Sequence, residues 1–252
     1  MIKRFTKVIV HPGMYHADEL VALVLLRAYG ISWEQYKRTR KISDEDRANP
    51  YVLIIDVGDV LDILKSNVDH HQDKRLPAAC VLIADWLSSE GLMSRGVRLR
   101  FNAFLTEISD IDRGITKTKP ATGLCEIVES LNRTMEFNDA LNFVQEIVNA
   151  HKVRAEKYVK DYNLWKKFTR IGHRKIVIGD RFIADWLQMA REDGTLLFIT
   201  PNNGNGGATM LSPDAVVDIP SHEGQTYRHS MGYMAKYNKI AVAEMHALDI
   251  LK

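Results

Sequence analysis

The strongest constraint on the fold is a buried strand that runs into a loop and then a helix near the start of the chain. Residues 7–10 form a short β-branched run, Lys-Val-Ile-Val, which is typical of a buried strand. A turn at His11-Pro-Gly follows this run, and Asp18 begins a predicted helix that Gly30 ends. A strand that leads into a helix in this way predicts an α/β fold built on a parallel sheet.

Two further strands are predicted over residues 35–40 and 51–55, and the second one ends at Asp56. Residues 60–67 suit a short amphipathic turn or helix, and the loop 69–72 (Asp-His-His-Gln) follows them. Polar side chains therefore come directly after strands, or begin helices, in several places. Because ligands bind at the carboxyl edge of a parallel α/β sheet, we expect these side chains to gather there.

The histidines and aspartates of these segments form a candidate metal site. Mixed imidazole and carboxylate ligands suit divalent cations such as Mn²⁺. A two-metal site, with ions roughly 3.5–4 Å apart, stabilises phosphoryl displacement and needs several ligands, one of them a bridging carboxylate. The candidate ligands are His11, His16, Asp18, Asp56, Asp69, Asp110 and Asp112. We expect two Mn²⁺ ions at this site, with Mg²⁺ as the alternative cation.

Each candidate ligand also has a structural explanation. Asp56 could be a cap or turn residue at the end of its strand, and His16 and Asp18 could be loop and N-cap residues. Asp110 and Asp112 flank a predicted turn after a helix that reaches residue 108, where they could simply be solvated. If one of this last pair is functional, it supplies a carboxylate to a second metal ion.

His70 and His71 are the candidate catalytic residues. We expect one of them to contact the scissile phosphate or to protonate the leaving group. Basic side chains close to the motifs could contact other phosphates, and the candidates are Arg38, Arg40 and Arg75. Charged runs of this kind are commonly solvated faces, which is the alternative explanation for these arginines.

A second candidate substrate-binding segment lies near the end of the chain. Residues 228–233 (Arg-His-Ser-Met-Gly-Tyr) offer a cation, an imidazole and an aromatic ring around a glycine. The predicted nucleotide clamp consists of Arg228, His229, Gly232 and Tyr233. A β-turn with a packed tyrosine explains the same segment without any ligand.

A long predicted helix over residues 138–168 organises the domains. Its second half is highly charged, which suits an exposed connector. We therefore expect a metal-binding catalytic domain over residues 1–150 and a helical connector over 151–170. A smaller C-terminal α/β domain over 171–252 is expected to bind the substrate. The connector could also mediate a homodimer.

Composition excludes some classes of protein. The formal net charge of +2 gives no global attraction to a polyanion, so any phosphate binding must come from local basic clusters. No apolar run approaches the ~18 residues of a membrane span. Cys80 and Cys125 lie in apolar surroundings and belong to no CxxC or Cys/His zinc pattern, so we expect two buried free thiols. We expect a cytoplasmic protein with no membrane contact.

These segments, in this order, resemble the DHH phosphoesterase superfamily. Within it the chain looks most similar to the family of the melanocyte-proliferating-gene exonuclease. The resemblance rests on four motifs, which are His11 to Glu19, Arg38-Thr-Arg40, Asp56-Val-Gly58 and Asp69-His-His-Gln72. Looser matches follow at residues 109–114 and 229–233, so the resemblance is strong over 1–115 and weak but collinear over 180–252.

The resemblance implies a DHH-type domain that binds a Mn²⁺ pair and hydrolyses phosphoester or phosphoanhydride bonds. We expect a 3′–5′ exonuclease that acts on short single-stranded RNA or DNA. One alternative keeps the site but changes the substrate to dinucleotides, cyclic dinucleotides or pyrophosphate. Another alternative is a metal- or nucleotide-binding module without catalysis. The partners would then be single-stranded nucleic acid or a small nucleotide.

Overall fold

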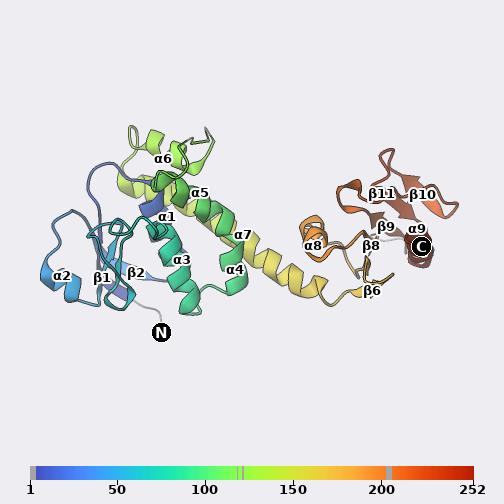
Figure 1. Ribbon diagram of the computed structural model, residues 1–252, viewed down its shortest axis with the longest axis horizontal. Helices are drawn as coiled ribbons and strands as arrows, with labels where there is room; N and C mark the ends of the chain where they lie inside the picture. Colours follow the sequence, from blue (N-terminus) through green and yellow to red (C-terminus); the bar gives the residue numbers. More distant parts are fainter. Residues whose placement is uncertain (1–3, 118, 121, 203–205) are drawn as a thin grey trace. The chain divides into compact units, whose positions relative to one another are not determined.

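The computed structural model describes residues 4–117, 119–120, 122–202 and 206–252 (Figure 1). The chain divides into two compact units, Met1–Glu156 and Lys157–Lys252, and each unit has its own sheet with helices. The predicted α/β class is therefore confirmed. The separate roles that we expect for the catalytic domain, the connector and the substrate-binding domain remain a prediction.

The first unit is built on a five-stranded sheet in the order β2-β1-β3-β5-β4. Its strands are β1 (Arg4–Val10), β2 (Ser32–Arg38), β3 (Val52–Ile55), β4 (Leu61–Asp62) and β5 (Asn67–Val68). The pairs β1–β2, β1–β3 and β3–β5 are parallel, whereas β4 runs antiparallel to β5. The predicted parallel sheet is present, with one short antiparallel strand at its edge.

Helix α1 lies at the centre of the first unit. Its residues 17–26 are all buried, as is usual for a helix that is covered on every side. It packs against α3, α5 and α6. The helices of this unit are α1 (Ala17–Ala28), α2 (Asp44–Ala48), α3 (Ala79–Ser89), α4 (Arg95–Arg100), α5 (Asn102–Asp112), α6 (Leu124–Leu131) and the first part of α7 (Phe137–Trp165), with a 3₁₀ turn η1 (Ile63–Lys65).

Two local predictions for the first unit need correction. Residues 60–67 contain the 3₁₀ turn that we expected, but they also contribute strand β4 and the first residue of β5. Strands of two residues give no hydrophobic period, so the sequence pattern could not reveal them. The helix that we expected to reach residue 108 continues as α5 to Asp112, so Asp110 and Asp112 lie in its last turn.

The second unit contains a six-stranded sheet in the order β10-β11-β9-β8-β7-β6. Only β7–β8 is a parallel pair, and the other neighbouring pairs are antiparallel. Helix α9 packs on β8, β9 and β11 over a buried apolar core. The elements are β6 (Thr169–Ile171), β7 (Ile176–Ile178), α8 (Trp186–Asp193), β8 (Leu197–Pro201), β9 (Ala208–Leu211), η2 (Pro213–Ala215), β10 (Gln225–Arg228), β11 (Met234–Tyr237) and α9 (Ile240–Ile250).

Two further expectations concern membranes and thiols. Every helix of the described residues falls short of a bilayer span in length or in apolarity. Both cysteines are free: Cys80 is buried in α3, while Cys125 in α6 is half-buried. The prediction of two free thiols is confirmed, although only one of them is fully buried.

Candidate metal centre

Three adjacent parallel strands bring ligand-type residues to one edge of the first sheet. Strand β3 lies between β1 and β5, and the residues that follow the three strands are His11, Asp56 and Asp69. The carboxyl ends of parallel strands share one edge of a sheet, and ligands bind there. The short strand β5, which was not predicted, is what places Asp69 beside the other two residues.

Asp56 is the central carboxylate of this group. Its backbone has φ of 56°, a left-handed conformation that aspartate and asparagine tolerate better than most residues. Its Oδ1 lies 3.2 Å from Nε2 of His70 and 3.8 Å from Nδ1 of His71, while its Oδ2 lies 3.7 Å from Nε2 of His11. One buried carboxylate therefore lies within 4 Å of three imidazoles.

Asp18 connects the start of α1 to the start of α3. Its carboxylate accepts hydrogen bonds from the backbone N–H groups of Ala79 (2.9 Å) and Cys80 (2.7 Å), which are unpaired donors of the first turn of α3. Burial, followed by the negative charges of Asp56 and Asp112, raises the pKa of Asp18 to about 8. Without a cation this site therefore favours a proton on Asp18.

His70 is buried among carboxylates. Its Nε2 lies 3.2 Å from Oδ1 of Asp56, 3.2 Å from Oδ2 of Asp112 and 4.0 Å from Oδ2 of Asp18. Burial acts to lower the pKa of His70, but the contacts with Asp112 and Asp56 outweigh it and raise the pKa to about 10. A positive charge at this position compensates the surrounding aspartates.

Asp69 and His71 form a hydrogen-bonded pair beside this cluster. Oδ1 of Asp69 accepts from the backbone N–H of His70 at 2.7 Å and lies 2.7 Å from Nδ1 of His71. Burial acts to raise the pKa of Asp69, but the hydrogen bonds from His71 and from the backbone of Asp59 lower it to about 2. The hydrogen bond to Asp69 raises the pKa of His71, whose side chain is 55% exposed.

Glu19 lies beside the site, although no role was predicted for it from the sequence motif that contains it. It is fully buried, and its Oε1 lies 3.2 Å from Nε2 of His11 and accepts a hydrogen bond from Nη2 of Arg38 at 3.2 Å. Burial acts to lower the pKa of His11, but Glu19 outweighs it and raises the pKa to about 9. As the third helical residue in a capping box, Glu19 looked like an ordinary cap.

The structure separates the two aspartates at the end of α5. Asp112 lies beside His70, and its Oδ1 is 4.0 Å from Nδ1 of His16. Asp110 instead lies 4.0 Å from Nη1 of Arg113 and belongs to none of the ligand groups found among the described residues. Asp112 is therefore the member of the predicted pair that reaches the cluster.

The ligand-type side chains fall into three overlapping groups, in each of which one atom per residue lies within 4.8 Å of all the others. The groups are Asp56-Asp69-His70-His71, His11-His16-Asp56 and Asp18-His70-Asp112. We call these residues the His/Asp cluster. Shared members join the groups into one continuous set of imidazole and carboxylate ligands, which could hold metal ions.

A cleft of about 370 Å³ opens on one side of the His/Asp cluster, and we call it the polar cleft. Arg40 and Arg47 line it together with cluster residues. Nη1 of Arg47 donates to the backbone oxygen of Gly58 at 2.8 Å. A Cβ on Gly58 would lie 3.2 Å from this guanidinium and 2.8 Å from Ile42, so glycine allows the arginine to approach. Arg40 was predicted from the sequence as a phosphate contact, whereas Arg47 was not.

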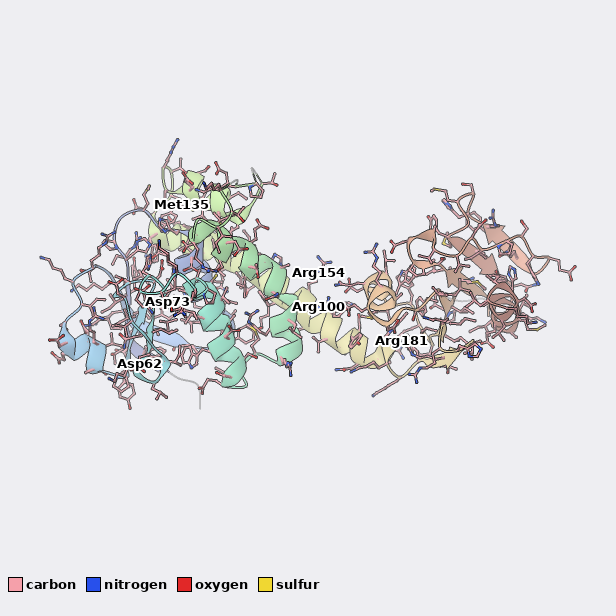
Figure 2. All side chains as sticks on the ribbon, in the orientation of Figure 1. Asp62, Asp73, Arg100, Met135, Arg154 and Arg181 are labelled. Carbon is pink, nitrogen blue, oxygen red and sulfur yellow. The ribbon has the colours of Figure 1, made fainter. Side chains whose placement is uncertain are left out.

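The other predicted arginines of the first unit have different surroundings. Arg38 is held at the cluster by Glu19, and its guanidinium lies 4.6 Å from the ring centroid of Phe137. Arg75 is 90% exposed, pairs with Asp73 and does not line the polar cleft (Asp73 is labelled in Figure 2). The alternative explanation, a solvated charge, describes Arg75 best.

The predicted clamp near the end of the chain lies in the second unit, around the turn that joins β10 to β11. Arg228 donates to Asp218 at 2.7 Å and to the backbone oxygen of Ile219. The rings of His229 and Tyr233 lie 4.3 Å apart. Gly232 has φ of 67°, and a Cβ there would clash with Asp218, so the hairpin itself explains the glycine. The predicted substrate-binding role of these residues stays a prediction.

Comparison with known proteins supports the resemblance in the first unit. Residues 7–95 match a family model named MYG1_exonuc and described as "Uncharacterised protein family (UPF0160)". This is the melanocyte-proliferating-gene family that the motifs resemble, whereas the wider DHH superfamily stays a prediction. No curated protein matches the chain. An uncharacterized protein from Helicobacter pylori G27 aligns over 97% of this chain and 99% of its own, with 8% identity and a TM-score of 0.28.

Proposed function

We propose that the first unit is a metal-dependent phosphoesterase of the nuclease type. The observation that carries this proposal is the convergence of histidines and mostly buried aspartates beside the carboxyl ends of three adjacent strands, with arginines lining the cleft beside them. Carboxylate-rich sites with a bridging acid are typical of two-metal phosphoryl-transfer enzymes. The name of the matched family model points to an exonuclease-like activity.

The donor set of the cluster fits Mn²⁺. Imidazole and carboxylate ligands together suit this ion, and Mg²⁺ is the alternative where carboxylates dominate. Oε2 of Glu19 is buried and has no hydrogen-bond partner among the described residues, although Oε1 of the same carboxylate lies 3.2 Å from His11 of the cluster. The residues that would hold the ions are His11, His16, Asp18, Asp56, Asp69, His70 and Asp112. When bound, divalent cations polarise phosphate oxygens and lower the pKa of a coordinated water.

His71 is the residue that we assign to leaving-group protonation. Hydrolysis joins a water oxygen to phosphorus and breaks the bond to the leaving oxygen, which then needs a proton. The hydrogen bond from Nδ1 to Asp69 orients the exposed ring of His71 and favours its protonated form. His70 is buried against three aspartates, so it suits the holding of a cation better than proton transfer.

Arg40 and Arg47 would bind the phosphates of the substrate. Both residues line the polar cleft, and arginine binds phosphate through paired hydrogen bonds. We propose short single-stranded RNA or DNA as the substrate and 3′–5′ as the polarity of cleavage. Dinucleotides, cyclic dinucleotides and pyrophosphate would use the same cluster, and their turnover is an alternative outcome of the experiment that follows.

The experiment compares hydrolysis of 3′- and 5′-labelled oligonucleotides by the wild-type protein and by Asp56→Asn in the presence of Mn²⁺. Asparagine tolerates the left-handed backbone at this position, so the variant removes one charge and leaves the local conformation intact. Asp139→Asn, the same chemical change at an exposed position of α7, is the matched control. We expect a loss of at least ~100-fold in kcat/KM for Asp56→Asn alone.

The length of the substrate is the second variable. Oligonucleotides of two to about ten residues separate an exonuclease from a dinucleotide hydrolase, and the order of the labelled products gives the polarity. Equal activity of wild type and Asp56→Asn would refute the proposed site. Tight Mn²⁺ binding without turnover of any of these phosphoesters would instead support a non-catalytic binding module.

A further inference from the structure

A second cleft, of about 250 Å³, opens from the His/Asp cluster in the first unit, and we call it the apolar cleft. Its apolar lining consists of Met14, Tyr15, Ala17, Ile108, Ile111, Cys125 and Val128. The rest of the lining comes from the cluster and from three polar residues, Lys119, Glu129 and Asn132. Neither the sequence motifs nor the proposed metal site assigns a role to this cleft.

The wall of the apolar cleft is fixed by hydrogen bonds that occupy its polar groups. Oδ1 of Asn132 accepts from the backbone N–H of Tyr15 at 2.8 Å, and its Nδ2 donates to the backbone oxygen of Tyr15 at 2.6 Å. The hydroxyl of Tyr15 donates to the backbone oxygen of Met135 at 2.9 Å. Lys119 and Glu129 pair with each other. The wall therefore presents apolar surface to a ligand.

The apolar cleft and the His/Asp cluster share residues. His16, Asp18 and Asp112 line the cleft, and the same side chains belong to the ligand groups of the cluster. If a phosphate binds at the cluster, the organic group bonded to that phosphate would therefore lie at the mouth of this cleft. The cluster also lines the polar cleft, where Arg40 and Arg47 provide positive charge.

We propose that the apolar cleft takes the nucleobase of the nucleotide whose phosphate binds at the His/Asp cluster. The inference rests on the proposed function, to which it adds the position of the base. A base has two apolar faces and a short connection, through the sugar, to its phosphate. The cleft is smaller than the roughly 300 Å³ at which pockets for whole small molecules begin, so it suits one group of a larger ligand.

The cleft also sets an expectation for base specificity. Asn132 is committed to Tyr15, and Lys119 and Glu129 are paired with each other, so few polar groups remain to distinguish one base edge from another. Contacts with the faces of a base are tolerant of sequence because every base has them. Purine and pyrimidine nucleotides should therefore bind with similar affinity.

The test is a titration that measures the contribution of the base directly. Isothermal titration calorimetry compares adenosine 5′-monophosphate with ribose 5-phosphate, both in Mn²⁺, on the full chain. The two ligands carry the same phosphate and sugar, so their difference reports the base alone. We expect the nucleotide to bind at least ~10-fold more tightly than the sugar phosphate, since each buried methylene equivalent corresponds to roughly a fourfold change in affinity.

Two variants change the cleft in opposite ways. Cys125→Phe fills it from α6, and Ile111→Ala removes part of its wall on α5. We expect the tenfold preference for the nucleotide to fall below about twofold in Cys125→Phe and to fall several-fold in Ile111→Ala. Val153→Phe, on an exposed position of α7, is the control and should keep the preference. Ile111→Ala tests the inference if Cys125→Phe does not fold.

The outcomes separate this inference from the proposed function. Hydrolysis of phosphoesters that is unchanged in both cleft variants, in a protein that binds adenosine 5′-monophosphate no more tightly than ribose 5-phosphate, would overturn the base site while leaving the phosphoesterase intact. Tighter binding of the nucleotide than of the sugar phosphate, lost in Cys125→Phe and found in a protein without turnover, would support the base site and refute the phosphoesterase. Equal binding of the two ligands by the wild-type protein would overturn the inference.

Discussion

Nε2 of His70 lies 3.2 Å from Oδ2 of Asp112, and this contact joins the sheet to the helical part of the first unit. His70 follows the short strand β5, while Asp112 ends helix α5. The carboxylates that surround His70 thus come from a strand end and from two helices. The site is complete only when these elements have packed together.

The first prediction uses the two aspartates at the end of α5. Asp112→Asn should weaken Mn²⁺ binding by at least ~10-fold, because it removes a charged group that faces His70 and His16. Asp110→Asn is the matched control, since it makes the same change two residues away, outside the cluster. Calorimetric titration with Mn²⁺ measures both variants. Equal affinities in the two variants would remove Asp112 from the site.

The second prediction is that binding of Mn²⁺ at pH 7 releases protons. In the metal-free protein the pKa of His70 is raised to about 10, that of His11 to about 9 and that of Asp18 to about 8. These groups are therefore largely protonated at pH 7, and they must lose protons before they can act as ligands.

The number of released protons follows from calorimetry in buffers with different enthalpies of ionisation. We expect on the order of three protons per protein at pH 7 and a smaller number at pH 9.5, where Asp18 and His11 have largely lost theirs. A binding enthalpy that does not depend on the buffer would contradict the prediction.

The third prediction concerns the pH dependence of stability without metal. The pKa of Asp18 is raised from its ordinary value of 3.8 to about 8 in the folded protein. Between these values the folded state holds a proton that the unfolded state lacks, so the contribution of Asp18 to stability falls as the pH rises. The change is at most ~1.4 kcal/mol for each pH unit within this window.

Asp18→Asn should remove this dependence, and its amide oxygen keeps an acceptor for one of the two N–H groups of α3. Urea unfolding of wild type and variant at pH 5 and pH 8, both in EDTA, measures the difference. We expect the variant to gain stability relative to wild type as the pH rises. A parallel loss of stability in both proteins would show that Asp18 does not titrate in this range.

The fourth prediction concerns the wall of the apolar cleft. Asn132→Ala removes two hydrogen bonds to the backbone of Tyr15 and should lower the free energy of unfolding by about 1–3 kcal/mol. Gln145→Ala removes a hydrogen bond to Asn149 on the same helix and should cost no more than about 0.5 kcal/mol. Chemical denaturation compares the two, and similar losses would argue against a structural role for Asn132.

The order of elements around β1 could be predicted from the sequence because each of its signals is local. The β-branched run before His11 predicted the second half of β1, and the acidic start together with Gly30 predicted the bounds of α1 to within one residue. The structure also places His11 and Asp56 at neighbouring strand ends, which follows once the strands are parallel. The histidines and aspartates of the motifs predict metal binding from their side-chain chemistry alone, without any knowledge of their contacts.

Several parts of the site depend on contacts between distant segments. Asp110 and Asp112 are equivalent as a sequence pattern, and only the packing of α5 beside the sheet brings one of them to His70. The sequence pattern explains Glu19 as a helix cap, and only the folded structure shows its contacts with His11 and Arg38.

The sequence by itself determined which side chains could bind a cation and that His11 and Asp56 follow strands, because strand periodicity and ligand chemistry are encoded locally. Only the tertiary structure decided which carboxylates meet, where Arg47 lies, and that an apolar cleft adjoins the cluster. The physical reason is that distances between segments are set by the packing of strands and helices far apart in the chain.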